Sequence, residues 1–238
     1  MENFTRFDIY DTKGIEYLFV IGYLLLLIVF WNIAKSPQAI KLYKKAIGTV
    51  SAKVLRIPQG IFFSRFHTWT HLGESGDAKV GLDDFLQQIT GKIKFTRLKN
   101  PGELIEKGDL LTVIDQGGKQ LEVYSPITGT IVDTNSLLTN DQEMIVGDPY
   151  ESGWVYKIKP TDWVKETQTY LLADEAADWA TKELDRFKDF LAGEAMKRYS
   201  SKPSMVLLQD GGEIRENVLS ELPDDVWANF QEEFLKIS

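Results

Sequence analysis

The stretch IDQGGKQLEVYSPITG, from Ile114 to Gly129, carries the clearest structural signal in this chain. Two runs that alternate β-branched and polar residues flank Gly117-Gly118, a pair that permits the positive φ angles of a two-residue hairpin turn. The stretch therefore predicts a β-hairpin with Lys119 beside its turn. Lys119 has two interpretations: it is a solvated turn residue, or it is the attachment point of a covalently bound cofactor.

Short strands continue on both sides of this hairpin. Runs rich in β-branched and aromatic residues, separated by Gly, Pro, Asn and Asp, extend from Phe66 to Trp163 and predict a compact antiparallel β domain. The predicted strands are KIKFTRL at Lys92–Leu98, LLTVID at Leu110–Asp115, QLEVYS at Gln120–Ser125 and GTIVDT at Gly129–Thr134. One short helix is expected over Leu82–Ile89, where the apolar residues share one helical face.

Five segments of this domain follow one another in a familiar order: HTW at 67–69, VGLDDFLQQITGKI at 80–93, PGELIEKGD at 101–109, VYSPITGTIVDTN at 123–135 and DPYESGWVYKIKPTDW at 148–163. In order and spacing they resemble the glycine cleavage system H protein family, a member of the lipoyl and biotinyl domain superfamily. The resemblance implies a flattened β-barrel of two sheets, which displays a modified lysine at a hairpin tip. It covers somewhat less than half of the chain.

The resemblance also bears on Lys119. In the family the modified lysine stands in a segment like E-S-V-K-A, a few residues before V-Y-A-P. A gapless count back from 123–126, VYSP, places the family's lysine position on Gly118 and its glutamate position on Asp115. Lys119 lies one residue too late, and a one-residue slip in a strand turns a side chain to the opposite face. The prediction is therefore a chain without a cofactor, with lipoate on Lys119 as the alternative.

An uncharged segment, YLFVIGYLLLLIVFWNIA at Tyr17–Ala34, precedes the β domain. About 20 apolar residues cross a hydrocarbon core of roughly 30 Å, so residues 16–34 are predicted to be a transmembrane helix in the lipid bilayer. Residues 1–15 form a tail and 35–60 a basic juxtamembrane linker in this scheme. Acidic residues before the apolar run, and no small-residue cleavage site after it, argue against a signal peptide.

The flanking charges predict the orientation of that helix. Only Arg6 and Lys13 precede it, whereas five lysines follow it: Lys35, Lys41, Lys44, Lys45 and Lys53. Because positive charge favours the cytoplasmic side, the C-terminal domain is expected in the cytoplasm, on a single-pass protein of the bacterial inner membrane.

Residues 164–238 are predicted to be a helical C-terminal extension to the β domain at 61–163, which makes the chain α+β. A long helical pattern is followed by a small hairpin with Asp210-Gly211-Gly212 at its turn, and the last helix starts near Pro223. Its aromatic stripe has two interpretations, a partner contact or the domain's own core, and core is favoured. The stripe consists of Trp227, Phe230 and Phe234.

Several classes of protein are disfavoured by composition. The net charge of -8 argues against a nucleic-acid binder, and the absence of cysteine excludes thiolate chemistry and cysteine-ligated metals. His67 and His71 are expected to be structural, because no second cluster of ligands accompanies them. No nucleophile-elbow or phosphate-binding motif is present, so no catalytic residue and no metal site is predicted. Three adjacent carboxylate pairs are interpreted as solvated faces or helix-start charges: Asp83-Asp84, Asp224-Asp225 and Glu232-Glu233.

These features predict a non-catalytic, membrane-anchored accessory subunit whose H-like domain docks soluble proteins. By analogy with the resembled family, its partners would be other subunits of a membrane complex of the respiratory or electron-transport kind. The alternative is a membrane-tethered lipoyl carrier modified on Lys119.

Overall fold

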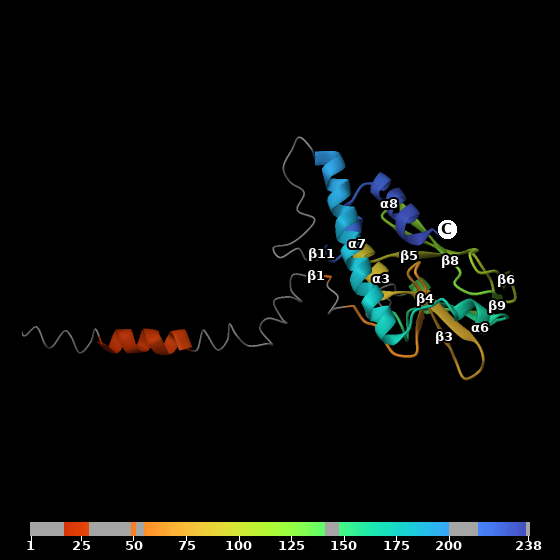
Figure 1. The fold of residues 1–238 in the computed structure, drawn as a ribbon, viewed down its shortest axis with the longest axis horizontal. Coiled ribbons are helices and arrows are strands. Elements are labelled where there is room, and N and C mark those ends of the chain that lie inside the picture. The colour runs from red at the N-terminus through yellow and green to blue at the C-terminus, as the bar shows by residue number, and fades with distance from the viewer. Residues whose placement is uncertain (1–16, 29–48, 51–54, 141–147, 200–213, 237–238) are drawn as a thin grey trace, which may run out of the picture. The chain divides into compact units, whose positions relative to one another are not determined.

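The computed structural model describes residues 17–28, 49–50, 55–140, 148–199 and 214–236 (Figure 1). The chain divides into two compact units, Met1–Gly48 and Thr49–Ser238. In the first unit, residues 17–28 form a helix with exposed side chains. Within the described ranges, no helix combines the length and apolarity that a membrane crossing requires. The other residues of the predicted span, 16 and 29–34, and most of the predicted linker lie outside the described residues.

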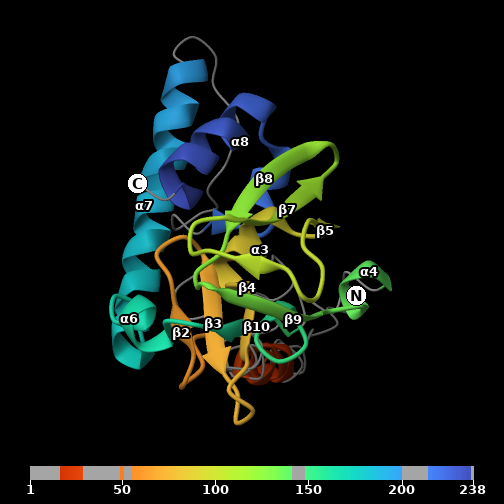
Figure 2. The ribbon, with the colours of Figure 1, turned by 90° about the vertical axis from the view of Figure 1, so that its right-hand side faces the viewer.

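The second unit contains the antiparallel β domain that the strand pattern predicts, in two main sheets as the family resemblance implies (Figure 2). The larger sheet has the order β2 (Phe62–Phe63), β3 (Thr68–Leu72), β4 (Ala78–Leu82), β10 (Trp154–Pro160), β9 (Gly129–Thr134) and β6 (Leu104–Ile105). The smaller sheet has the order β5 (Lys94–Arg97), β7 (Leu110–Gln116) and β8 (Lys119–Tyr124). A separate pair joins β1 (Thr49–Val50) to β11 (Ile214–Arg215). The four strands expected from the sequence are therefore confirmed.

The hairpin between β7 and β8 has the expected two-residue turn. Gln116 pairs with Lys119 across it, and the two residues between them, Gly117 and Gly118, have φ angles of 62° and 91°. Positive φ at both turn positions suits the right-handed twist of the strands, and glycine adopts it without a Cβ clash.

Helix α3 (Asp84–Thr90) confirms the predicted short helix but begins two residues later than expected. Leu82 still belongs to β4, and the side chain of Asp83 accepts a hydrogen bond from the Leu86 amide at 2.8 Å. Asp83 is thus the N-cap residue, which satisfies one of the amides that a helix start leaves without an intrahelical partner.

The C-terminal extension packs on the β domain as helices (Figure 2). They are α6 (Trp163–Thr167), α7 (Ala173–Tyr199), the 3-10 helix η1 (Val218–Glu221), α8 (Asp224–Phe230) and the π-helix η2 (Gln231–Leu235). The predicted start near Pro223 is confirmed, because this residue is the N-cap of α8. Most of the predicted small hairpin, 205–214, lies outside the described residues; its last residue, Ile214, pairs with Val50 in the β1–β11 ladder.

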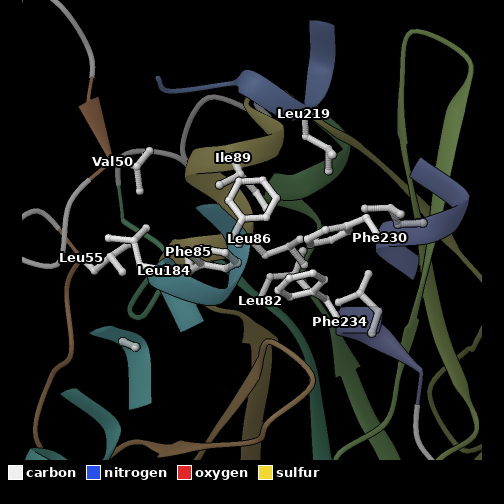
Figure 3. Packing of buried hydrophobic residues seen from close by; sticks show 14 of the residues in the cluster. Val50, Leu55, Leu82, Phe85, Leu86, Ile89, Leu184, Leu219, Phe230 and Phe234 are labelled. Atoms are coloured by element: carbon white, nitrogen blue, oxygen red, sulfur yellow. The ribbon is translucent and has the colours of Figure 1, made fainter. Parts of the chain in front are cut away.

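Buried apolar side chains form two clusters. The smaller one lies mainly on the large sheet and comprises Ala78, Val80, Ile105, Leu111, Ile127, Ile131, Leu138, Val155, Tyr156 and Ile158. The larger one joins the hairpin sheet to α3 and the C-terminal helices, and Figure 3 shows Leu86, Phe230 and Phe234 among its members. Trp227, Phe230 and Phe234 are 2%, 0% and 1% exposed. The favoured interpretation of this stripe as core is confirmed.

Gly129 is the position in the sheets where a single methyl group should cost most. A Cβ there would lie 2.2 Å from the backbone oxygen of Lys159 and 2.7 Å from Cγ2 of Ile158, on the neighbouring strand. Since that oxygen belongs to the β9–β10 pairing, we expect Gly129→Ala to lower the free energy of unfolding by about 3 kcal/mol. Urea unfolding of the full chain in detergent, followed by circular dichroism, measures the change.

Gly193→Ala is the matched control for Gly129→Ala. A Cβ at Gly193, within α7, meets no atom within 4 Å. Alanine in a helix interior stabilises by up to about 1 kcal/mol relative to glycine, so this variant should be neutral or more stable. Equal destabilisation by both substitutions would contradict the close approach of β9 and β10.

Candidate functional site

Lys119, the residue singled out from the sequence, is held by the C-terminal extension. Its Nζ donates hydrogen bonds to the carbonyl oxygens of Ser220 at 2.8 Å and Leu222 at 2.6 Å. The same Nζ lies 5.7 Å from the ring centroid of Trp227, on α8. Two carbonyl dipoles and an aromatic face together form a site for a cation.

The period of strand β8 directs Lys119 to this site. Its side chain is half-buried and lies on the same face as the buried Leu121 and Val123, whereas Gln120 and Glu122 point to solvent. Alternate residues of a strand face opposite sides, so the amine is aimed at the face that the C-terminal extension covers. The interpretation of Lys119 as a solvated turn residue is therefore wrong. Its partners lie about a hundred residues later in the chain, where no local pattern reveals them.

The covering segment, Val218–Leu235, is called the cap below. Trp227 fixes its fold by donating from Nε1 to the Leu219 oxygen at 2.7 Å. A second attachment to β8 comes from Gln231, whose side chain accepts from the Glu122 amide at 2.8 Å and donates to the Glu122 oxygen at 3.2 Å. The cap therefore contacts the hairpin through both backbone and side-chain groups.

The groups around Lys119 fit an ammonium ion and do not fit a lipoyl amide. Acylation removes the positive charge and leaves a single N–H, whereas the site presents two carbonyl acceptors and an aromatic ring. Gly118, where the gapless count places the family's lysine, has no side chain to modify and is exposed. Its φ of 91° disfavours any L side chain at that position.

A second polar cluster surrounds His67, which is fully buried. Nδ1 of His67 lies 2.8 Å from Oδ2 of Asp83, and Nε2 lies 3.4 Å from Oε1 of Glu183 on α7. His71 projects to solvent from β3. Within the described part of the chain, no three or more ligand-type side chains are placed to hold a metal ion.

The carboxylate pair at the start of α3 corrects one expectation. Asp83 and Asp84 are 2% and 1% exposed, so they do not form a solvated face. Asp83 caps α3 and faces His67, while Asp84 accepts from the backbone amide of Arg56 at 2.9 Å and from its guanidinium at 3.0 Å. Their interpretation as helix-start charges is correct.

Glu183 is the residue of this cluster that the sequence reasoning missed. It lies among the buried residues of α7, between Ala180 and Phe187, at the spacing of the apolar stripe. An acidic residue at such a position requires a buried partner, and that requirement is the signal that could have identified it. The carbonyl groups that bind Lys119 cannot be identified from a comparable sequence pattern.

Comparison with known proteins places this geometry in a family. Residues 61–184 match the family described as Glycine cleavage H-protein, a match that reaches into α7. A probable glycine cleavage system H protein of Pyrococcus furiosus is 32% identical over 124 residues, covering 52% of this chain and 92% of that protein. The glycine cleavage system H protein of Psychrobacter cryohalolentis is 34% identical over 119 residues, covering 50% of this chain and 94% of that protein.

A crystal structure of a glycine cleavage system H protein from Mycobacterium marinum matches 52% of this chain and 98% of that chain, at 25% identity and a TM-score of 0.46. The family match spans more than half of the 238 residues, and the relatives are covered almost end to end. The chain therefore belongs to the glycine cleavage H-protein family.

Proposed function

We propose that this protein is a non-catalytic accessory subunit, anchored in the bacterial inner membrane through residues 16–34, whose H-like domain docks soluble proteins at the cytoplasmic face. The observation that carries the proposal is the binding of the Lys119 ammonium by the Ser220 and Leu222 carbonyls. In this proposal the protein acts by docking other proteins within a membrane complex of the respiratory or electron-transport type. The anchor rests on the uncharged sequence from Tyr17 to Ala34.

The contacts of Lys119 oppose its use as a carrier. Hydrogen bonds to a charged group contribute roughly 1.5–3 kcal/mol each, and an acylated lysine loses the charge and two of its three donors. An acylating enzyme would also have to displace the cap before it reached the amine. These costs favour a lysine that stays unmodified and fastens the cap.

A membrane-tethered lipoyl carrier is the second candidate. The observation that favours it is the similarity to proteins named glycine cleavage system H proteins, together with an intact hairpin whose turn carries a lysine. In that case lipoate would be attached to Lys119, and the cap would have to open during modification.

The test is the intact mass of the protein purified from its native membranes, with peptide mapping across 114–126. We expect an unmodified mass for Lys119. An octanoyl or lipoyl group on this residue would overturn the accessory role and establish the carrier.

Two substitutions of Lys119 test the same proposal: Lys119→Arg by its function in cells, and Lys119→Met by the stability of the protein. Lys119→Arg keeps the positive charge that the carbonyls bind, so an accessory subunit should retain its function, whereas a carrier should lose it. Lys119→Met removes the charge and should lower the free energy of unfolding by about 2 kcal/mol, because two carbonyls lose their donor. The matched control is Lys94→Met, which removes an exposed lysine from the same sheet and should change stability little.

A further inference from the structure

We infer that His67 is a buried imidazolium that clamps helix α7 onto the β domain by bridging Asp83 and Glu183, so that attachment of this helix depends on a bound proton. His67 and Asp83 flank the β3–β4 hairpin, and Glu183 lies in the middle of α7. The bridge therefore joins the β domain to its C-terminal extension. Lys119 is not a member of this bridge.

The carboxylates beside the two ring nitrogens favour a proton on each nitrogen. Nδ1 lies 2.8 Å from an Asp83 oxygen, and Nε2 lies 3.4 Å from a Glu183 oxygen, which is ion-pair range without hydrogen-bond geometry. A neutral imidazole donates from one nitrogen only, so the lone pair of its unprotonated nitrogen would face a buried carboxylate. With both nitrogens protonated, each carboxylate faces an N–H.

Counted over the described residues around it, the charges of the cluster balance when His67 is positive. The carboxylates packed around it are Asp83 and Asp84 from the start of α3 and Glu183 from α7. Two guanidinium groups lie at the edge: Arg56 pairs with Asp84 at 3.0 Å, and Arg186 pairs with Glu183 at 2.8 Å. Among the residues that the structure describes, the ion pair of Asp83 is with His67. The remaining polar group, the Tyr150 hydroxyl, is uncharged because burial raises its pKa further above the usual value. An imidazolium supplies the missing positive charge, which a buried carboxylate needs.

Aromatic rings from three elements enclose the imidazole. Phe85 of α3 stacks on it with ring centroids 4.7 Å apart, Trp179 of α7 lies at 5.4 Å, and Phe234 of η2 lies at 6.3 Å. Ring faces attract a cation, and this favours the charged imidazole over the neutral one. The same rings exclude water, which strengthens the attraction between His67 and the two carboxylates.

The proton affinity of the ring agrees with this arrangement. Burial by itself lowers the pKa of His67, but the charges and hydrogen bonds of Asp83 and Glu183 outweigh it and raise the pKa to about 9. The backbone conformation at His67 is also fixed. His67 has a φ of 59°, a left-handed conformation uncommon for residues other than glycine, and its oxygen accepts from the Asp83 amide at 3.0 Å.

Nuclear magnetic resonance of ring-labelled histidine in the full chain, in detergent micelles, tests the clamp directly. The chain has only two histidines, and His71→Gln assigns the signals by removing the exposed one. We expect both nitrogens of His67 to be protonated at neutral pH, with a titration midpoint near 9. A singly protonated ring at neutral pH would overturn the inference, and the wild-type protein alone gives this answer.

Glu183→Gln tests the link to helix α7. Loss of one of the two carboxylates should move the midpoint of His67 down by about one pH unit or more, and should speed hydrogen exchange in peptides from 173–199 at neutral pH. The matched control is Glu175→Gln, which removes the same charge from the exposed side of the same helix. An unchanged midpoint in Glu183→Gln, or the same response to both substitutions, would show that Glu183 does not stabilise the protonated form of His67.

Discussion

Truncation of Trp227 to alanine should lower the free energy of unfolding by about 3–5 kcal/mol, the range for removing a large buried aromatic side chain. Trp227 is 2% exposed, donates to the Leu219 oxygen at 2.7 Å, and lies beside the Lys119 ammonium. Its loss leaves a cavity in the core and leaves the Leu219 oxygen without its donor. It also removes the aromatic ring beside the Lys119 ammonium. Urea unfolding of the full chain in detergent, followed by circular dichroism, measures the effect.

Two controls separate these contributions. Trp227→Phe keeps most of the buried ring but loses the N–H, so it should cost roughly 1–3 kcal/mol, the range for leaving the Leu219 oxygen without its donor. Val164→Ala truncates an apolar side chain that is 73% exposed and should change stability by less than about 0.5 kcal/mol. A Trp227→Ala variant as stable as Val164→Ala would mean that the cap does not belong to the core.

The second large effect is a loss of stability at alkaline pH. The pKa of His67 is raised from 6.5 to about 9 by folding. The folded state therefore binds a proton that the unfolded state has released, and stability is fully present below 6.5 and falls as pH rises through 9. One pH unit corresponds to about 1.4 kcal/mol, so the total loss is on the order of 3 kcal/mol.

Unfolding free energies measured from about pH 6 to about pH 10 would reveal this slope. His67→Gln is the control, because it removes the titrating ring while other groups of the chain still titrate. We expect a lower stability at neutral pH and a much flatter dependence up to pH 9 in this variant. The same slope in wild type and His67→Gln would assign the alkaline loss to other residues.

Local sequence patterns were enough for the four predicted strands, the turn and the start of the last helix. Gly117-Gly118 specifies a turn because both positions have positive φ, and Pro223 precedes a helix because its ring fixes φ near the helical value. The start of α3 was misplaced by two residues because Leu82 continues the apolar face of the helix while pairing in β4. Periodicity alone does not separate the two roles.

The two polar sites depended on contacts between distant segments. The sequence singled out Lys119 correctly but gave it the wrong surroundings, since its acceptors are backbone oxygens of Ser220 and Leu222. The pair Asp83-Asp84 appeared solvated because adjacent carboxylates usually are. The buried partners of this pair are a histidine and an arginine that reach it from other parts of the chain.

The antiparallel strands, the glycine turn and the aromatic stripe of the last helix could be predicted from the sequence, because they depend on the conformational preferences of neighbouring residues and on side-chain periods of 2 and 3.6. The family resemblance came from the order and spacing of five segments. That the lysine beside the turn is a bound cation, and that the buried histidine bridges two carboxylates, became clear only from the folded structure. The physical reason is that the energy of a charge depends on which groups surround it, and chain folding brings those groups from 16 and 116 residues away for His67 and from 101 and 103 residues away for Lys119.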